Sequence, residues 1–244
     1  MLPAMWVFPL AAALVALAFA GLLAQRWFAR RRTYHALWAA ALLMYAVASF
    51  EVFLGSLGGW TSSGFRTYWL LGAVLNVPFL ALGELELLVR NRAVRAAMYA
   101  LTVFVTAYAI ARVRTAGVHA AALAEDLPSG KEVFGDGTPA HRLPQFVSIP
   151  AYLVLVGGAS WSAWRMRGRP ELRDRVAGTV LIALGATVIA AFGSTFAALG
   201  YLLAFSVALL AGIVVMFWGF LRASRPAPRP ASGSDGAPGR ATRA

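Results

Sequence analysis

The chain has 244 residues, of which 60% are hydrophobic and only 13% are charged, about half the share in a soluble domain. This composition excludes a water-soluble enzyme and indicates a multi-pass membrane protein. The absence of cysteine excludes a disulfide scaffold, thiol catalysis, zinc ribbons and iron–sulfur clusters. The net charge of +12 is typical of cytoplasmic loops in such a protein, and no nucleic-acid partner is expected.

Seven stretches of the chain are long and apolar enough to cross a lipid bilayer as helices. They predict an all-α fold, a polytopic bundle of seven transmembrane helices that occupies residues 1–222. In chain order the spans cover about 3–23, 35–54, 67–89, 94–113, 146–164, 176–199 and 201–221. The last two spans are nearly continuous, and Gly200 is the expected turn because about 46 apolar residues are too many for one span.

Lysine and arginine are divided unevenly between the two sides that these spans create. Seventeen of the 22 basic residues lie at 26–32, 90–95, 165–175 and 222–243, and the other five are Arg66, Arg112, Arg114, Lys131 and Arg142. Basic residues mark the cytoplasmic side, so we expect the N-terminus outside and the C-terminus inside. The preference for arginine over lysine, with much alanine, glycine and proline, is typical of a GC-rich bacterial genome. We therefore expect a protein of the bacterial plasma membrane.

Two segments lie outside the predicted spans. The external loop at about 114–145 holds His119, His141 and four acidic residues, but their spacing matches no pattern of metal ligands. We expect an ordinary solvated loop, and we expect no metal and no cofactor in the protein. The tail at 223–244 is rich in proline, alanine and arginine, and we expect it to be disordered. Its arginines and those of the basic loops favour anionic lipid head groups.

Ionisable side chains within the hydrocarbon are costly and indicate functional sites. Glu84 lies well inside the third span, which also carries Asn76 and Pro78 and is therefore the most polar and least regular span. Broken polar helices near the midplane line many substrate sites, so Asn76 and Glu84, with Glu51, form a candidate intramembrane polar site. The alternative is that Glu84 only makes a structural hydrogen bond to a neighbouring helix or to Arg95.

Two further pairs of charges are interpreted as structural. Glu86 precedes Arg90 by four residues, with the acid on the N-terminal side, which favours an ion pair on one helix face. Glu51 and Arg66 lie on either side of a short external loop and would pin this hairpin. If Glu51 instead faced a water-filled cavity, it could select cations or bind a proton.

Small residues recur at four-residue spacing in the last two spans, which allows helices to approach closely in lipid. We interpret the rows as the packing seam between these spans; they are Ala186, Ala190 and Ser194, and Ala204, Ala208 and Gly212.

A retinal protein is excluded because the single lysine, Lys131, lies in a loop. About 30 residues around the second and third spans carry a more specific likeness. The runs concerned are Gly58-Gly59-Trp60, Arg66-Thr67-Tyr68-Trp69, Leu71-Gly72-Ala73 and Leu82-Gly83. They resemble a stretch of uncharacterised seven-pass membrane proteins of actinobacteria. This resemblance implies the topology and the bacterial source, and it carries over no functional residues.

Three functions are compatible with this architecture. We favour the transport of a small solute or ion through a polar site on the third span. The alternative is a non-enzymatic sensor or scaffold subunit that packs against a partner membrane protein. An enzyme acting on lipid is the weakest of the three, because no nucleophile–base pair or metal cluster is visible.

Overall fold

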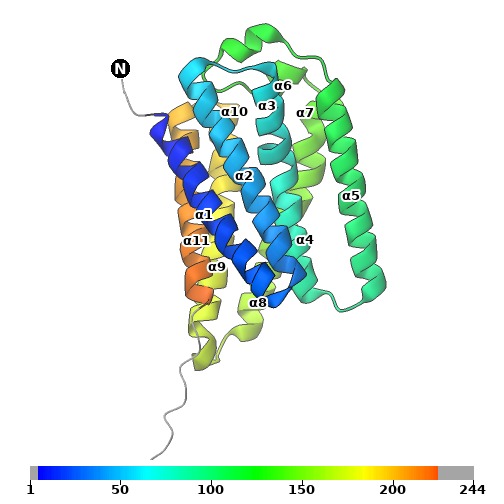
Figure 1. Ribbon diagram of the computed structural model, residues 1–244, viewed down its shortest axis with the longest axis vertical. Coiled ribbons are helices and arrows are strands. Elements are labelled where there is room, and N and C mark those ends of the chain that lie inside the picture. Colours follow the sequence, from blue (N-terminus) through cyan, green and yellow to red (C-terminus); the bar gives the residue numbers. More distant parts are fainter. Residues whose placement is uncertain (1–4, 225–244) are drawn as a thin grey trace, which may run out of the picture.

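The structure, a computed structural model, describes residues 5–224, and within them it is an all-α bundle without β-strands (Figure 1). Seven helical runs are long and apolar enough to span a membrane, as predicted. They are α1 (Val7–Arg30), α2 (Thr33–Gly58), Ser62–Leu88, α5 (Arg92–Thr115), Pro139–Met166, Arg173–Ala198 and α11 (Leu202–Ala223). Gly200 makes the predicted turn with a φ of +70°. The predicted disordered tail lies outside the described residues from position 225 onward.

Three of the seven runs contain a π-helical segment, in which the backbone bonds reach five residues back instead of four. The third run consists of α3 (Ser62–Tyr68), η1 (Trp69–Leu75) and α4 (Asn76–Leu88). The fifth consists of α7 (Pro139–Leu143), η3 (Pro144–Ser148) and α8 (Ile149–Met166). The sixth consists of α9 (Arg173–Thr187), η5 (Val188–Gly193) and α10 (Ser194–Ala198). Such segments are frequent at functional sites, which directs attention to the region that they share.

Six of the spans form a closed ring, and the fourth span, α5, lies outside it. Around the ring, α1 packs on α2, α2 on α4, α4 on α8, α8 on α9, α9 on α11, and α11 on α1. Helix α5 lies at the edge of the bundle, where it contacts the third span and α7 at the start of the fifth (Figure 1). Its outward side chains, such as Leu101, Val103 and Phe104, are highly exposed, as expected for a surface in contact with lipid.

Glycines bring α9 and α11 into direct backbone contact. Gly178 packs on the backbone of Gly219, and a Cβ at Gly185 would lie 2.5 Å from the carbonyl oxygen of Gly212. Gly212 therefore belongs to the seam that we predicted. The other predicted row, Ala186, Ala190 and Ser194, lines a cavity, and the elements η5 and α10 that bear Ala190 and Ser194 also contact α11.

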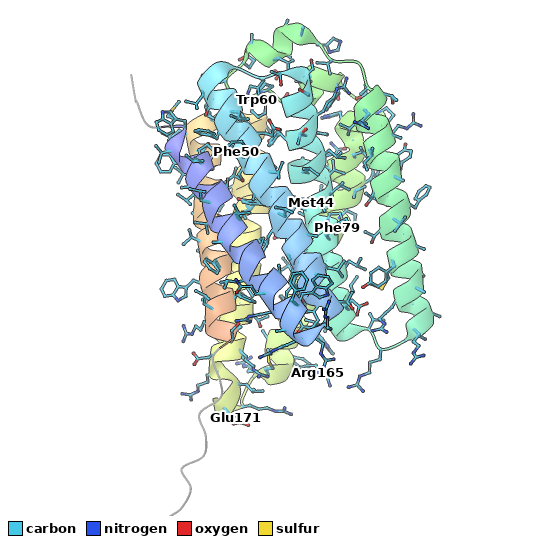
Figure 2. All side chains as sticks on the ribbon, viewed as in Figure 1. Met44, Phe50, Trp60, Phe79, Arg165 and Glu171 are labelled. Carbon is cyan, nitrogen blue, oxygen red and sulfur yellow. The ribbon has the colours of Figure 1, made fainter. Side chains whose placement is uncertain are left out.

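The two ends of the bundle differ in charge and in the length of their connecting segments. At the basic end lie the arginines of the turns after α1, α4 and α8, and Arg165 marks this end in Figure 2. At the loop end lie the turn between α2 and α3, the long segment 116–138 and the turn at Gly200. The division of basic residues inferred from the sequence thus corresponds to two opposite ends of the structure.

The long segment at the loop end is a packed cap, and the expectation of a solvated loop is wrong. It forms η2 (Ala120–Ala124) and α6 (Gly130–Phe134), and α7 follows it. Its buried apolar residues are Leu123, Leu127, Val133 and Phe134. Trp60, labelled at this end in Figure 2, donates its indole N–H to the carbonyl of Asp126 at 3.1 Å. These contacts fix the cap on the ends of α2 and α3.

Candidate functional site

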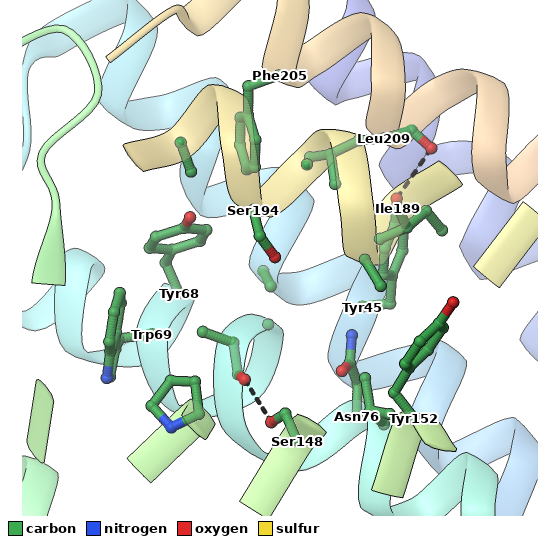
Figure 3. A pocket seen from close by; sticks show the side chains of 18 of the residues that line it. Tyr45, Tyr68, Trp69, Asn76, Ser148, Tyr152, Ile189, Ser194, Phe205 and Leu209 are labelled. Carbon is green, nitrogen blue, oxygen red and sulfur yellow. Dashed lines mark hydrogen bonds between the residues drawn. The ribbon is translucent and has the colours of Figure 1, made fainter. Parts of the chain in front are cut away.

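The ring surrounds a cavity of about 810 Å³ that reaches from the cap past the middle of the spans, to Leu80, Leu155 and Met216. Figure 3 shows part of its wall. This volume is typical of a small-molecule site. Helix α2, the third, fifth and sixth spans, α11 and the cap line it, whereas α1 and α5 do not. All three π-helical segments contribute to its wall, so the three irregular spans are irregular where they face the cavity.

The cavity wall is mainly apolar and aromatic, with a few polar groups. Its aromatic side chains are Tyr45, Tyr68, Trp69, Tyr152 and Phe205. Apart from the tyrosines, its ionisable side chains are Lys131 of the cap and His141 of α7, and no carboxylate is among the described lining residues. The deeper part of the cavity therefore suits an uncharged group.

Two residues of the wall carry a buried polar atom without a hydrogen-bond partner in the described part of the chain, namely His141 on α7 and Asn76 on α4. Only 5% of Asn76 is exposed, and its carboxamide oxygen is the buried atom without a hydrogen bond. A buried acceptor left in this state costs about 1–3 kcal/mol. Figure 3 shows this carboxamide at the wall, near Tyr45 and Tyr152. Asn76 therefore carries a buried acceptor beside the cavity, which a hydrogen-bond donor that reaches it would satisfy.

Pro78 and Ser148 explain how the backbone near Asn76 tolerates its irregular path. Pro78 has no N–H, so the carbonyls of Ala73 and Val74, five and four residues earlier, lack the donor that a helix supplies. The hydroxyl of Ser148 in η3 donates to both, at 2.6 Å to Ala73 and 3.1 Å to Val74 (Figure 3). The third and fifth spans are thus joined at the cavity wall.

Two tyrosines tie helices together around the cavity. Tyr45 on α2 donates to the carbonyl of Leu209 on α11 at 2.9 Å. Tyr152 on α8 and Thr187 on α9 form a bond of 2.9 Å between their hydroxyls. Further toward the basic end the helices are in close contact, so the cavity ends inside the bundle.

Glu84 does not join Asn76 at the cavity. It lies about 12 Å farther along the third span, at 1.5 Å per residue. The residue is 8% exposed and packs between α4 and α8, where a Cβ at Gly158 would be 3.2 Å from its Oε1 atom. Ser162, one turn beyond Gly158, is its polar neighbour. The structure favours the alternative of a contact with a neighbouring helix, and this helix is α8 rather than the one bearing Arg95.

Glu51 also lies away from the cavity, and its predicted pairing with Arg66 is wrong. Its Oε2 atom would be 2.8 Å from a Cβ at Gly64, in the first turn of α3, where unpaired backbone N–H groups favour a negative charge. Arg66 instead donates to three carbonyls at the end of α5, namely those of Val113, Arg114 and Ala116. The last carbonyls of a helix have no backbone donor, and the forked guanidinium supplies several.

The predicted pair of Glu86 with Arg90 is also replaced by another. Helix α4 ends at Leu88 and the backbone turns to extended geometry at Val89, so the i, i+4 relation does not hold at Arg90. Glu86 bonds instead to Arg95 at 3.3 Å and to the hydroxyl of Tyr99 at 2.7 Å, both on α5. These two bonds hold α5 to α4.

Because α5 has few other contacts, we expect it to depend on the three bonds from Arg66. Replacing Arg66 by glutamine should destabilise the protein by about 1–3 kcal/mol, since it leaves helix-end carbonyls without donors. Hydrogen exchange should accelerate in the last two turns of α5 and not in α9. Arg112→Gln, at the same helix end, is the control and should have a small effect. Equal effects of the two variants would contradict this role of Arg66.

The histidines of the cap do not form a metal site with its carboxylates. His119 bonds to the carbonyl of Glu132 at 3.1 Å, and His141 lies 3.8 Å from Asp136. Within residues 5–224 no group of three or more such side chains could hold a metal ion.

Comparisons of this chain with protein-family models, with curated proteins and with solved structures give no match. The resemblance to actinobacterial seven-pass proteins therefore stays a prediction. The inference of function rests on the geometry of the cavity.

Proposed function

We propose that this protein transports a small, mostly apolar molecule across or out of the membrane, and that the cavity at Asn76 is its substrate site. The observation that carries the proposal is the unpaired, buried carboxamide of Asn76 in a large apolar cavity. Selection tolerates an unsatisfied buried polar group where a ligand satisfies it, and binding sites commonly pair apolar walls with a few such groups.

The shape of the cavity supports transport by alternating access. It reaches the cap at one end and is closed at the other by close contacts between helices, as in one state of a transporter. The π-helical segments lie in three spans at this level, where the backbone can change its bonding pattern with little loss. Bending at these segments would open the basic end as the loop end closes.

The proposed orientation follows from the charged ends. With the basic end in the cytoplasm of a bacterium, the N-terminus and the cap are external, and the cavity lies beneath the external cap of a plasma-membrane protein. The arginines of the basic end would contact anionic lipid head groups.

A sensor is the second candidate, and the closed basic end favours it. A sensor needs a ligand site but no path through the bundle, and it passes its signal to another protein. The exposed face of α5 offers a surface for such a membrane-protein partner. The two candidates differ in one observable, which is whether the cavity ever opens toward the basic end.

Because the chain has no cysteine, one introduced thiol tests this difference. Ala73→Cys places a thiol on the cavity wall, and a membrane-impermeant methanethiosulfonate is applied to oriented vesicles from either side. Transport predicts labelling from both sides, faster from the loop end. Ser63→Cys, at the exposed loop end, should be labelled from that side alone. Labelling of the Ala73 variant from the loop end only would reject transport in favour of a sensor.

A further inference from the structure

The route into the cavity has a feature that the proposed transport does not require. From the loop end, the cap covers the cavity. Gly130 of α6 lies on the ring of Trp69, close enough that a Cβ there would overlap it, and the indole N–H of Trp69 donates to the carbonyl of Ala140 at 2.9 Å. A molecule arriving from water would have to pass this packed layer.

On its side, the cavity reaches the surface between α8 and the sixth span. Ile149 and Leu153 of α8 belong to its wall, yet they are 55% and 63% exposed. On the facing side, Ala191 and Ala198 are likewise both exposed and part of the wall. Residues that line the cavity and are exposed on two neighbouring spans mark the edges of a lateral gap.

A hydrogen bond limits the gap on the side of the basic end. The bond between Tyr152 and Thr187 joins α8 to α9 below it, toward the basic end. Ala191 lies one turn above Thr187 on the same span, so its small side chain leaves the space above this bond open. The edges of the gap are mainly apolar, with Gln145 and Ser194 as their polar members, and they belong to membrane-spanning runs, so the gap faces lipid.

We infer that the cavity receives a lipid-soluble alcohol or phenol directly from the bilayer through this gap, with the hydroxyl of the molecule bound to Asn76. The inference rests on the proposed function and adds its substrate class and its route. An apolar body fits the aromatic wall, and a hydroxyl donates to the free oxygen of Asn76. An ionised group would be left without a counter-charge in the deep part of the cavity, where burial of a charge is costly.

The test follows a brominated alcohol into the cavity of the full chain in lipid nanodiscs. The probe is 12-bromododecan-1-ol, whose bromine quenches nearby tryptophan, and Trp69 in the wall reports its arrival. The signal from the cavity is the part of the quenching that is present in the wild type and absent in Trp69→Phe. Ala191→Phe narrows the gap, and Ala211→Phe, on an exposed face of α11 outside the cavity wall, is the matched control.

We expect Ala191→Phe to slow the arrival of the probe by about tenfold, a barrier increase of ~1.4 kcal/mol, while the control binds at the wild-type rate. If Ala191→Phe does not fold, Ala198→Phe on the same edge replaces it. Ala122→Phe, which adds bulk to η2 of the cap outside the cavity wall, should not slow binding. Slower binding in the Ala122 variant with wild-type rates in the variants of the gap would overturn the lateral route and leave the binding site in place. No cavity signal in the wild type would instead reject the proposed function itself.

Discussion

Replacing Asn76 by leucine is expected to stabilise the protein in the absence of ligand. Leucine resembles asparagine in shape and removes a buried acceptor that has no partner, which should raise the free energy of unfolding by about 1–3 kcal/mol. A gain of stability that accompanies a loss of function is characteristic of residues kept for binding. Unfolding in mild detergent, followed through tryptophan fluorescence, measures the change.

Ser206→Ala is the control for this prediction. Ser206 is completely buried on α11, its hydroxyl also lacks a partner in the described chain, and it is not part of the cavity wall. Its removal should stabilise the protein by a similar mechanism without changing ligand binding. A destabilised Asn76→Leu variant would mean that the carboxamide makes a bond which holds the fold, and would contradict our account of the cavity.

The second large effect is expected at the contact between α9 and α11. A methyl group at Gly185 would meet the carbonyl oxygen of Gly212 and the side chain of Met216, each at 2.5 Å. Because one contact is with backbone, the two helices must separate, and Gly185→Ala should destabilise the protein by about 1–3 kcal/mol. The midpoint of thermal unfolding in detergent measures this loss.

Gly157→Ala provides the comparison within a helix. Gly157 lies on α8 with no atom near the position of its Cβ, so alanine there should be neutral or should stabilise the helix by roughly 0.5–1 kcal/mol. If Gly185→Ala lowers the stability and Gly157→Ala does not, the loss at Gly185 is due to close packing and not to helix propensity. A neutral Gly185→Ala would show that α9 and α11 are not held by this contact.

The number of spans and the Gly200 turn could be predicted because both depend on local properties. A helix in lipid must satisfy its own backbone bonds and reach across the hydrocarbon, so length and hydropathy are sufficient. The limits of the fifth span were less accurate. It begins at Pro139, where Thr138 caps the helix through the N–H of His141, but the polar composition of this turn had suggested a loop.

The site was predictable only in part, because its residues meet through tertiary contacts. Asn76 was identified as a polar residue in an irregular span, and it lies at the cavity. Glu84 was grouped with it from their positions on one helix, but a shift of about 12 Å along the axis separates them. The wall formed by Tyr68, Trp69 and Ser148 was missed, since aromatic and hydroxyl residues are common in spans and no periodic pattern distinguishes those that face a cavity.

The predicted partners of Arg66 and Glu86 were wrong for a related reason. Arg66 and Glu86 were assigned to neighbours in sequence, whereas both bind α5, whose position beside the ring no local pattern reveals. Pro78 marked the irregular span correctly, since it leaves carbonyls without their helical donor. The single hydroxyl of Ser148, 75 and 74 residues away in the chain from Ala73 and Val74, is shared between these carbonyls.

The most direct test of the cavity as a binding site compares 12-bromododecan-1-ol with its methyl ether in the wild type and in Asn76→Leu. The ether has the same apolar body but cannot donate a hydrogen bond to the carboxamide. We predict that the wild type binds the alcohol about five- to tenfold more tightly, equivalent to the ~1–1.5 kcal/mol of one hydrogen bond, and that the variant does not distinguish the two. Equal affinities in the wild type, or an unchanged preference in the variant, would contradict the assignment of Asn76 as the acceptor for a ligand.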